Sequence, residues 1–196
     1  MANLTKLVSK LTPGLKGSLE SAVGISVKHK MKTVDVAAWI YCVIEDRDAD
    51  LHTFLASQGV DIEYTLQDID ENLRRAGGQM GSQPTISGDL VELIKKAWLT
   101  ASVEMDAAEL TPEMILLAHL QPNAMGLKTL ASKSLEDVST ESLNDFASKR
   151  APRMEGGSVT AGNGSAPSAG SPVADGALTK FTINLTEQAR QGKLDP

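Results

Sequence analysis

Four side chains, three histidines and one cysteine, have the chemistry to bind a metal ion or act as a nucleophile. The histidines are His29, His52 and His119, and no two of them stand three or four residues apart, the spacing that places two ligands on one helical turn. Cys42 is the single cysteine and lies in the most apolar run, which is typical of a small buried hydrophobic residue. The residues therefore favour neither a metal site nor a catalytic thiol, and a single cysteine allows no disulfide within the chain.

Phosphate chemistry also lacks the residues that it needs. Gly192-Lys193 has neither the preceding glycine nor the following hydroxyl residue of a phosphate-binding loop, so we expect no nucleotide hydrolysis by this chain. The net charge is −6 and the pI about 5.1, without a clustered basic face, which argues against a nucleic-acid partner. No apolar run reaches 18 residues and no signal peptide is visible, so we expect no membrane span.

The clearest pattern in the chain is the helical period of residues 87–120. Ser87 is a suitable N-cap, and Thr111 with Pro112 starts a second helix, because proline fits the first helical position. Residues 114–120 are apolar on nearly every side except His119, so we expect this helix to be buried. The apolar stripe of the first helix consists of Leu90, Leu93, Ile94, Ala97, Trp98 and Ala101.

The same pattern occurs earlier in the chain, at an offset of about 75 residues. Residues 35–44 correspond to 111–120, and the helix-start residues of the second copy identify both segments as helices. The spacing of Leu90, Ile94, Ala97, Trp98 and Ala101 is repeated by Leu15, Leu19, Ala22, Val23 and Ser26. A self-match at a fixed offset indicates a duplicated unit. We therefore predict an all-α domain over residues 1–150, a double four-helix repeat (12–76 and 87–150) packed as a pseudo-dimer.

An extra helix over residues 3–11 precedes the first repeat and has no counterpart before the second. Its apolar face consists of Leu4, Leu7, Val8 and Leu11. Nine residues make a marginal helix in isolation, so this helix must dock to persist. It is either a packing arm that caps the domain or one wall of a groove that binds a partner.

The rest of the chain completes the repeats and then changes character. Further helices are predicted over residues 50–59, 61–76, 124–133 and 139–150, with Gly59 and Gly77-Gly78 as left-handed helix ends. Residues 77–86 form a loop between the repeats, with Met80 and Ile86 as its apolar members. Residues 151–176 are dominated by Gly, Ser, Ala and Pro, which predicts a flexible linker. Residues 177–196 are patterned again.

The last segment, ALTKFTINLTEQARQGKLDP, resembles the opening of the first ATPase module of the Clp family of AAA+ unfoldases. A doubled helical repeat followed by a linker and this segment is similar to an N-terminal fragment of that family. Three segments are more similar to its type VI secretion members, ClpV (also TssH), than to the disaggregase ClpB: LVSKLTPGLKGSLESA, VDVAAWIYCVIED and DLVELIKKAWLTASVEM. The chain departs from them at residues 110–113 and at Ile86, where an aromatic residue is common.

The resemblance implies a domain that recognises the contracted TssB–TssC sheath. It would dock a helix near the N-terminus of TssC in an apolar groove, and the ATPase ring would then disassemble and recycle the sheath. Carried onto this chain, the groove is lined by Leu4, Leu7, Val8, Leu11, Leu15, Leu19 and Ile86. Specificity would come from the unrepeated first helix.

The resemblance also implies a bacterial cytoplasmic protein that is hexameric at full length, with a monomeric fragment. The linker would join the domain to its own AAA+ modules, which would bind ATP and Mg, with no cofactor in this chain. Two alternatives remain open: a general ClpB-type N-domain that binds unfolded or aggregated protein or an adaptor, and a purely structural helical domain.

Overall fold

The computed structural model describes residues 2–47, 50–78, 83–123 and 130–153, with side chains from Thr5 onward. The chain divides into two units, Met1–Gly157 and Ser158–Pro196, and all described residues belong to the first. The predicted segment 177–196, and the predicted linker beyond Arg153, lie outside the described residues.

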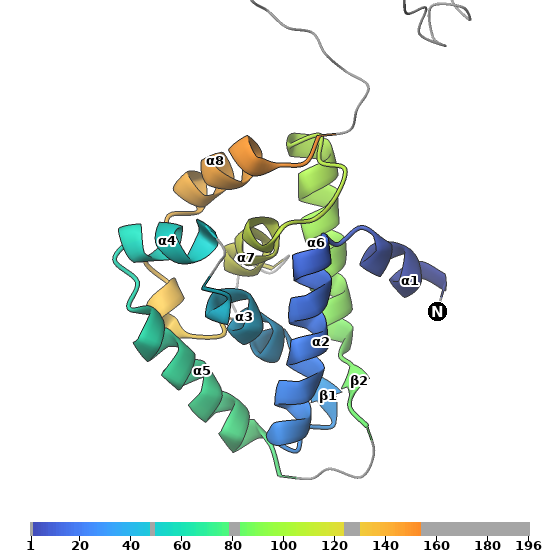
Figure 1. Ribbon diagram of the computed structural model, residues 1–196, viewed down its shortest axis with the longest axis vertical. Coiled ribbons are helices and arrows are strands. Elements are labelled where there is room, and N and C mark those ends of the chain that lie inside the picture. The colour runs from blue at the N-terminus through green and yellow to red at the C-terminus, as the bar shows by residue number, and fades with distance from the viewer. Residues whose placement is uncertain (1, 48–49, 79–82, 124–129, 154–196) are drawn as a thin grey trace, which may run out of the picture. The chain divides into compact units, whose positions relative to one another are not determined.

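The first repeat contains four helices, as predicted, and an extra helix precedes it (Figure 1). The extra helix is α1 (Ala2–Ser9), which ends two residues earlier than predicted. The repeat consists of α2 (Pro13–Lys28), α3 (Val36–Glu45), α4 (Asp50–Ser57) and α5 (Ile62–Ala76). Proline occupies the first turn of α2, and the Asp61 carboxylate accepts a hydrogen bond from the amide of Tyr64 at the start of α5.

The second repeat contains α6 (Gly88–Glu104), α7 (Pro112–Leu120), the 3-10 turn η1 (Lys133–Leu135) and α8 (Thr140–Arg150). The Ser87 hydroxyl caps α6 by accepting from the amide of Leu90 at 3.2 Å, as predicted. The predicted helix 124–133 lies mostly outside the described residues. For the described residues 130–132 the prediction is wrong, because they are not helical. Ser132 instead caps η1 by accepting from the Ser134 amide.

The predicted left-handed glycines are found after α4 but not directly at the end of α5. Gly59, after α4, has φ +82° and is a left-handed helix end as predicted. Gly77, after α5, has φ −76°, and the positive φ of the predicted Gly77-Gly78 pair falls on Gly78, at +131°. Glycine is required directly after α5 for a different reason: a Cβ at Gly77 would lie 1.8 Å from the carbonyl oxygen of His29.

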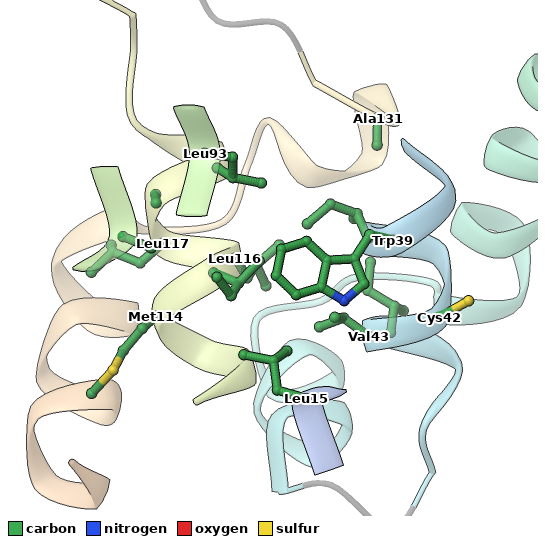
Figure 2. Packing of buried hydrophobic residues seen from close by; sticks show 14 of the residues in the cluster. Leu15, Trp39, Cys42, Val43, Leu93, Met114, Leu116, Leu117 and Ala131 are labelled. Carbon is green, nitrogen blue, oxygen red and sulfur yellow. The ribbon is translucent and has the colours of Figure 1, made fainter. Parts of the chain in front are cut away.

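The core is built around α3 and α7, which lie in the middle of the unit with the other helices around them (Figure 1). Trp39 has no exposed surface, and residues 113–120 are all buried. Leu15 and Leu116 lie beside the Trp39 ring, and Leu93 and Leu117 belong to the same cluster (Figure 2). The indole nitrogen of Trp39 donates to the Ser18 hydroxyl at 2.9 Å, so the one polar atom of this side chain is satisfied.

The repeats are joined by two main-chain pairings that the sequence did not predict. Strand β1 (Thr33–Val34) pairs in parallel with β2 (Thr85–Ile86), and Leu11 pairs in parallel with Leu110. Two-residue strands have no period that a sequence pattern can reveal.

Candidate peptide-binding surface

Helix α1 is docked on the body of the unit through its last turn and the two residues after it. The amide of Leu110 donates to the carbonyl of Lys10 at 2.7 Å, and the amide of Thr12 donates to the carbonyl of Leu110 at 3.0 Å. The ammonium group of Lys10 lies 4.9 Å from the centre of the Trp98 ring in α6, within the range of a cation–π interaction.

The seven predicted groove residues fall into three groups. Leu11 and Leu15 have no exposed surface, and Leu7 and Leu19 are 9% exposed, so these four belong to the hydrophobic core. Val8 and Ile86 are half-buried and pack against that core from its edge. The side chain of Leu4 lies outside the described residues. Among the predicted groove residues that the structure describes, Val8 and Ile86 are therefore the two whose apolar side chains still reach solvent.

Two exposed valines on α2 were not among the predicted groove residues. Val23 and Val27 are 37% and 42% exposed and stand one helical turn apart. Val23 was predicted to lie on the apolar stripe, but the core side of α2 consists of Leu15, Leu19, Ala22 and Ser26. At 100° per residue, Val27 points about 180° away from Ser18, which bonds to α3.

Figure 1 shows α3 on one side of α2, and α1 and β2 on the other. Val23 and Val27 therefore lie on the part of α2 that faces away from Ser18 and α3. We define the α1-side surface by its five apolar side chains: Val8, Val23, Val27, Ile86 and Trp98, which is half-buried. Apolar side chains that reach solvent beside polar residues such as Lys16 and Glu20 are the kind of surface on which a partner helix can dock.

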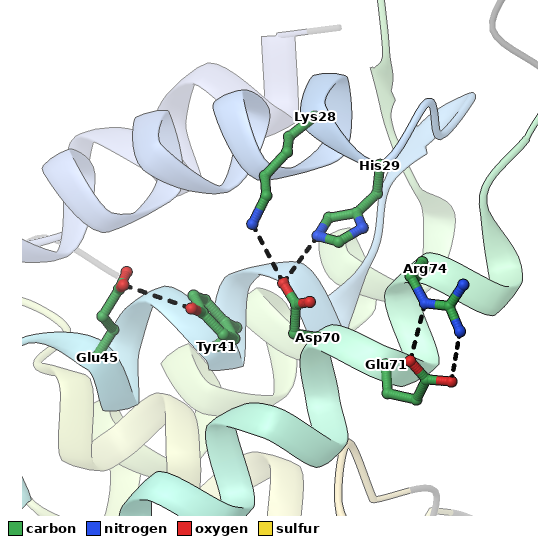
Figure 3. A network of polar contacts seen from close by, with 7 residues as sticks. All are labelled: Lys28, His29, Tyr41, Glu45, Asp70, Glu71 and Arg74. Carbon is green, nitrogen blue, oxygen red and sulfur yellow. Dashed lines mark hydrogen bonds and ion pairs between the residues drawn. The ribbon is translucent and has the colours of Figure 1, made fainter.

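Several polar groups outside this surface have structural roles. Asp70 of α5 accepts from Lys28 at 3.3 Å and pairs with His29 at 3.0 Å, which ties α2 to α5 (Figure 3). Hydrogen bonds from Arg74 lower the pKa of Glu71 to about 2, and burial raises the pKa of Cys42 to about 12. A thiol with such a pKa is not a nucleophile near neutral pH. Among the described residues, no group of His, Cys, Asp and Glu side chains converges to hold a metal ion.

His119 is buried and accepts a hydrogen bond through Nε2 from the amide of Ala131 at 2.9 Å. Burial, with a smaller contribution from Lys96, lowers the pKa of His119 to about 4, so the ring is neutral and carries its proton on Nδ1. None of the described helices has the length and apolar character needed to cross a bilayer.

The chain is similar to known proteins in both sequence and fold. No protein-family model matches the chain. The AAA+ ATPase ClpV1 of Pseudomonas aeruginosa is 26% identical over 97% of the chain, and a ClpB chaperone of Staphylococcus epidermidis is 23% identical over 96%. The solved N-domain of ClpV from Vibrio cholerae has a TM-score of 0.63 and 25% identity, and the match covers 74% of this chain and 87% of that one. The predicted resemblance to a ClpV-like N-terminal fragment of the Clp family is confirmed.

A second solved structure is a complex of the ClpV N-domain with a VipB peptide. It is 26% identical to this chain and has a TM-score of 0.62, and the match covers 74% of this chain and 89% of that one. The predicted all-α Clp N-domain fold is therefore confirmed, and the strand pair β1–β2 is a small addition to it. The chain spans about a fifth of the length of the curated relatives that it matches (22% and 20%).

Proposed function

We propose that this chain is the substrate-recognition N-domain of a type VI secretion AAA+ unfoldase, and that it binds a helix of the contracted TssB–TssC sheath. The observation that carries the proposal is α1, which is docked on α6 and is followed in the chain by a helix, α2, with exposed apolar side chains. A similar ClpV N-domain is known in complex with a VipB peptide, which supports a sheath segment as the ligand. The unit would deliver this segment to the ATPase modules of the full-length protein for disassembly and recycling of the sheath.

The binding mode is a helix in a groove. A partner helix places apolar side chains at positions i, i+3, i+4 and i+7 on one stripe, and such a stripe matches the Val23–Val27 spacing of one turn. Val8 of α1 and Ile86 of β2 would form the walls, while Leu7, Leu11, Leu15 and Leu19 form the packed floor beneath them. The proposed site therefore consists of the seven predicted residues together with Val23, Val27 and Trp98.

Anisotropy of a labelled helical peptide from the TssC N-terminus tests the proposal. Ile86→Arg and Val23→Arg should each weaken binding at least tenfold and leave the circular dichroism unchanged, because both side chains reach solvent. Leu7→Arg is a poor test, since it would bury a charge at a position that is 9% exposed. Leu99→Arg is the matched control, because Leu99 is 65% exposed on the outer side of α6.

The second candidate is a general ClpB-type N-domain that binds unfolded or aggregated protein or an adaptor, which the similarity to ClpB favours. An unstructured model substrate should then bind as tightly as the sheath peptide and should lose affinity in the same two variants. If all peptides bind Ile86→Arg and Val23→Arg as well as the unchanged chain, the α1-side surface is not the binding site.

A further inference from the structure

Each repeat has a hollow between its first helix and the end of its second helix, and the two hollows are lined by equivalent residues. The first is lined in α2 and at the end of α3, and the second in α6 and at the end of α7. The equivalent pairs, at offsets of 75 and 76, are Gly14 and Asp89, Gly17 and Glu92, Ser18 and Leu93, Ser21 and Lys96, Cys42 and Ala118, Glu45 and Gln121, and Asp46 and Pro122. The duplication therefore provides an internal comparison between two pockets of common origin.

The two hollows differ in size and in chemistry. The second has a volume of about 650 Å³ and the first about 280 Å³. The second also extends to the first turn of α3, where Val36 and Ala37 join Leu93 and Pro122 as its apolar lining. The first hollow instead has glycine and serine along its helix. A pocket that combines volume with an apolar lining has the properties of a ligand site, and the second hollow is the one that has them.

Among the described residues that line the second hollow, the one cation, Lys96, is already engaged. Lys96 donates to the carbonyl oxygens of Ala118 at 2.9 Å, Gln121 at 3.0 Å and Pro122 at 3.2 Å. These three bonds use all three protons of the ammonium group and cap the carbonyls at the end of α7. Lys96 therefore has no proton left to donate to an anionic ligand.

The carboxylates of the second hollow are more available. It is lined by Asp35, Asp89 and Glu92. Asp35 accepts from the Thr33 hydroxyl at 2.6 Å, and Glu92 pairs with Lys95 in an exposed ion pair. Asp89 is exposed and belongs to none of the ion pairs among the described residues. The carboxylates that can still accept a hydrogen bond thus stand beside an apolar lining.

We propose that this second-repeat pocket binds a lysine or arginine side chain of a partner protein. The aliphatic stem packs on Val36, Leu93 and Pro122, and the cationic end lies beside Asp89 and Glu92, the arrangement in which long basic side chains bury their stems and keep their charge solvated. Charge complementarity and the apolar lining together select this occupant over an acidic or a purely apolar one.

The pocket is separate from the α1-side surface. Leu93 and Trp98 are five residues apart on α6, which places them about 140° apart around the helix. The proposal therefore does not depend on the proposed function, although Ile86 of the α1-side surface is next in sequence to Ser87, which lines the pocket.

Amide chemical shifts of the full 196-residue chain test the proposal. The probe is the peptide acetyl-Ala-Leu-Arg-Leu-Ala-amide, and the comparison peptide has glutamate in place of arginine. The arginine peptide should shift the amides of Val36, Ala37, Asp89 and Leu93, with an affinity that falls as sodium chloride rises, because exposed charges are screened. Asp89→Asn combined with Glu92→Gln should raise its Kd roughly three- to thirtyfold, since each exposed charge pair contributes modestly.

Glu45→Gln is the matched control, because Glu45 lines the equivalent hollow of the first repeat, and it should leave the Kd unchanged within twofold. The proposal is overturned by any of three results: equal binding of the glutamate peptide, an unchanged Kd in the double variant, or shifts confined to Val8, Val23 and Val27. Absence of any shift at several millimolar arginine peptide overturns it as well. All three substituted side chains are exposed, so the variants should fold.

Discussion

Leu11 pairs its main chain with Leu110 in the same way that Val34 pairs with Ile86. Leu11 and Ile86 each precede the first helix of a repeat, and Val34 and Leu110 each follow it. The offsets are 75 residues for the first pair of positions and 76 for the second. The two pairings are thus the same contact, made once in each direction between the two copies of the duplicated unit. Helix α1 lies next to the Leu11–Leu110 pairing, and among the described residues the Val34–Ile86 pairing has no such helix beside it.

Ser18→Ala should destabilise the domain by about 1–3 kcal/mol, because it leaves the buried indole N–H of Trp39 without an acceptor. The Ser18 hydroxyl also donates to the carbonyl of Leu15 at 2.9 Å, so both of its roles are lost. Urea denaturation followed by tryptophan fluorescence measures the change. Ser21→Ala, at an exposed position, is the control, with an expected change within about 0.5 kcal/mol. An equal cost of Ser18→Ala in a Trp39→Phe background would contradict the assigned hydrogen bond.

The helices were predictable because their caps and apolar period are local properties of the sequence. Ser87, Asp61 and Pro13 each lie at the helix start that their chemistry favours. The candidate surface is harder to predict, since the period shows that Leu11 and Leu15 are apolar but not whether they face the core or a partner. That choice depends on how α1 docks, which is a tertiary contact. Val23 and Val27 were missed for the same reason.

Gly77→Ala should destabilise the domain by at least about 1–3 kcal/mol, because the added Cβ meets main-chain atoms of His29 that cannot rotate away. Gly24→Ala is the control in the opposite direction. Gly24 lies within α2 with open space around it, and the helical propensity of alanine should stabilise the domain by about 0.5–1 kcal/mol. Thermal unfolding of the two variants should move to opposite sides of the unchanged chain. A neutral Gly77→Ala would show that α2 and α5 do not approach so closely there.

His119 should make the domain less stable as the pH falls. Its pKa is about 4 in the folded chain and about 6.5 when unfolded, so the unfolded state binds more protons between these values. The contribution of His119 to stability is therefore fully present above pH 6.5 and is lost as the pH falls toward 4. Acidification to pH 5 should cost about 2 kcal/mol from this residue alone.

Urea denaturation at pH 8 and pH 5 tests this contribution. His119→Gln keeps an acceptor for the Ala131 amide but does not titrate, so its stability should fall by about 2 kcal/mol less between the two pH values. Equal slopes for His119→Gln and the unchanged chain would contradict the neutral buried ring.

Arg150 should stabilise the end of α8 through a carboxylate that is far more buried than the arginine itself. Its Nε donates to Oε1 of Glu113 at 3.1 Å, and the side chain also pairs with Asp50. Glu113 is 5% exposed, and its Oε2 has no hydrogen-bond partner among the described residues. Arg150→Met should therefore cost roughly 3 kcal/mol, since it leaves a buried charge without its counter-ion.

The exposed partner distinguishes burial from simple ion pairing. Asp50→Asn should cost less than about 1 kcal/mol, because that side chain is 60% exposed and its charge is solvated. Glu113→Met in the Arg150→Met background should restore most of the lost stability, because no unpaired charge then remains in the core. Equal costs for Asp50→Asn and Arg150→Met, or no recovery in the double variant, would mean that Arg150 acts through its packing on Phe146 rather than through Glu113.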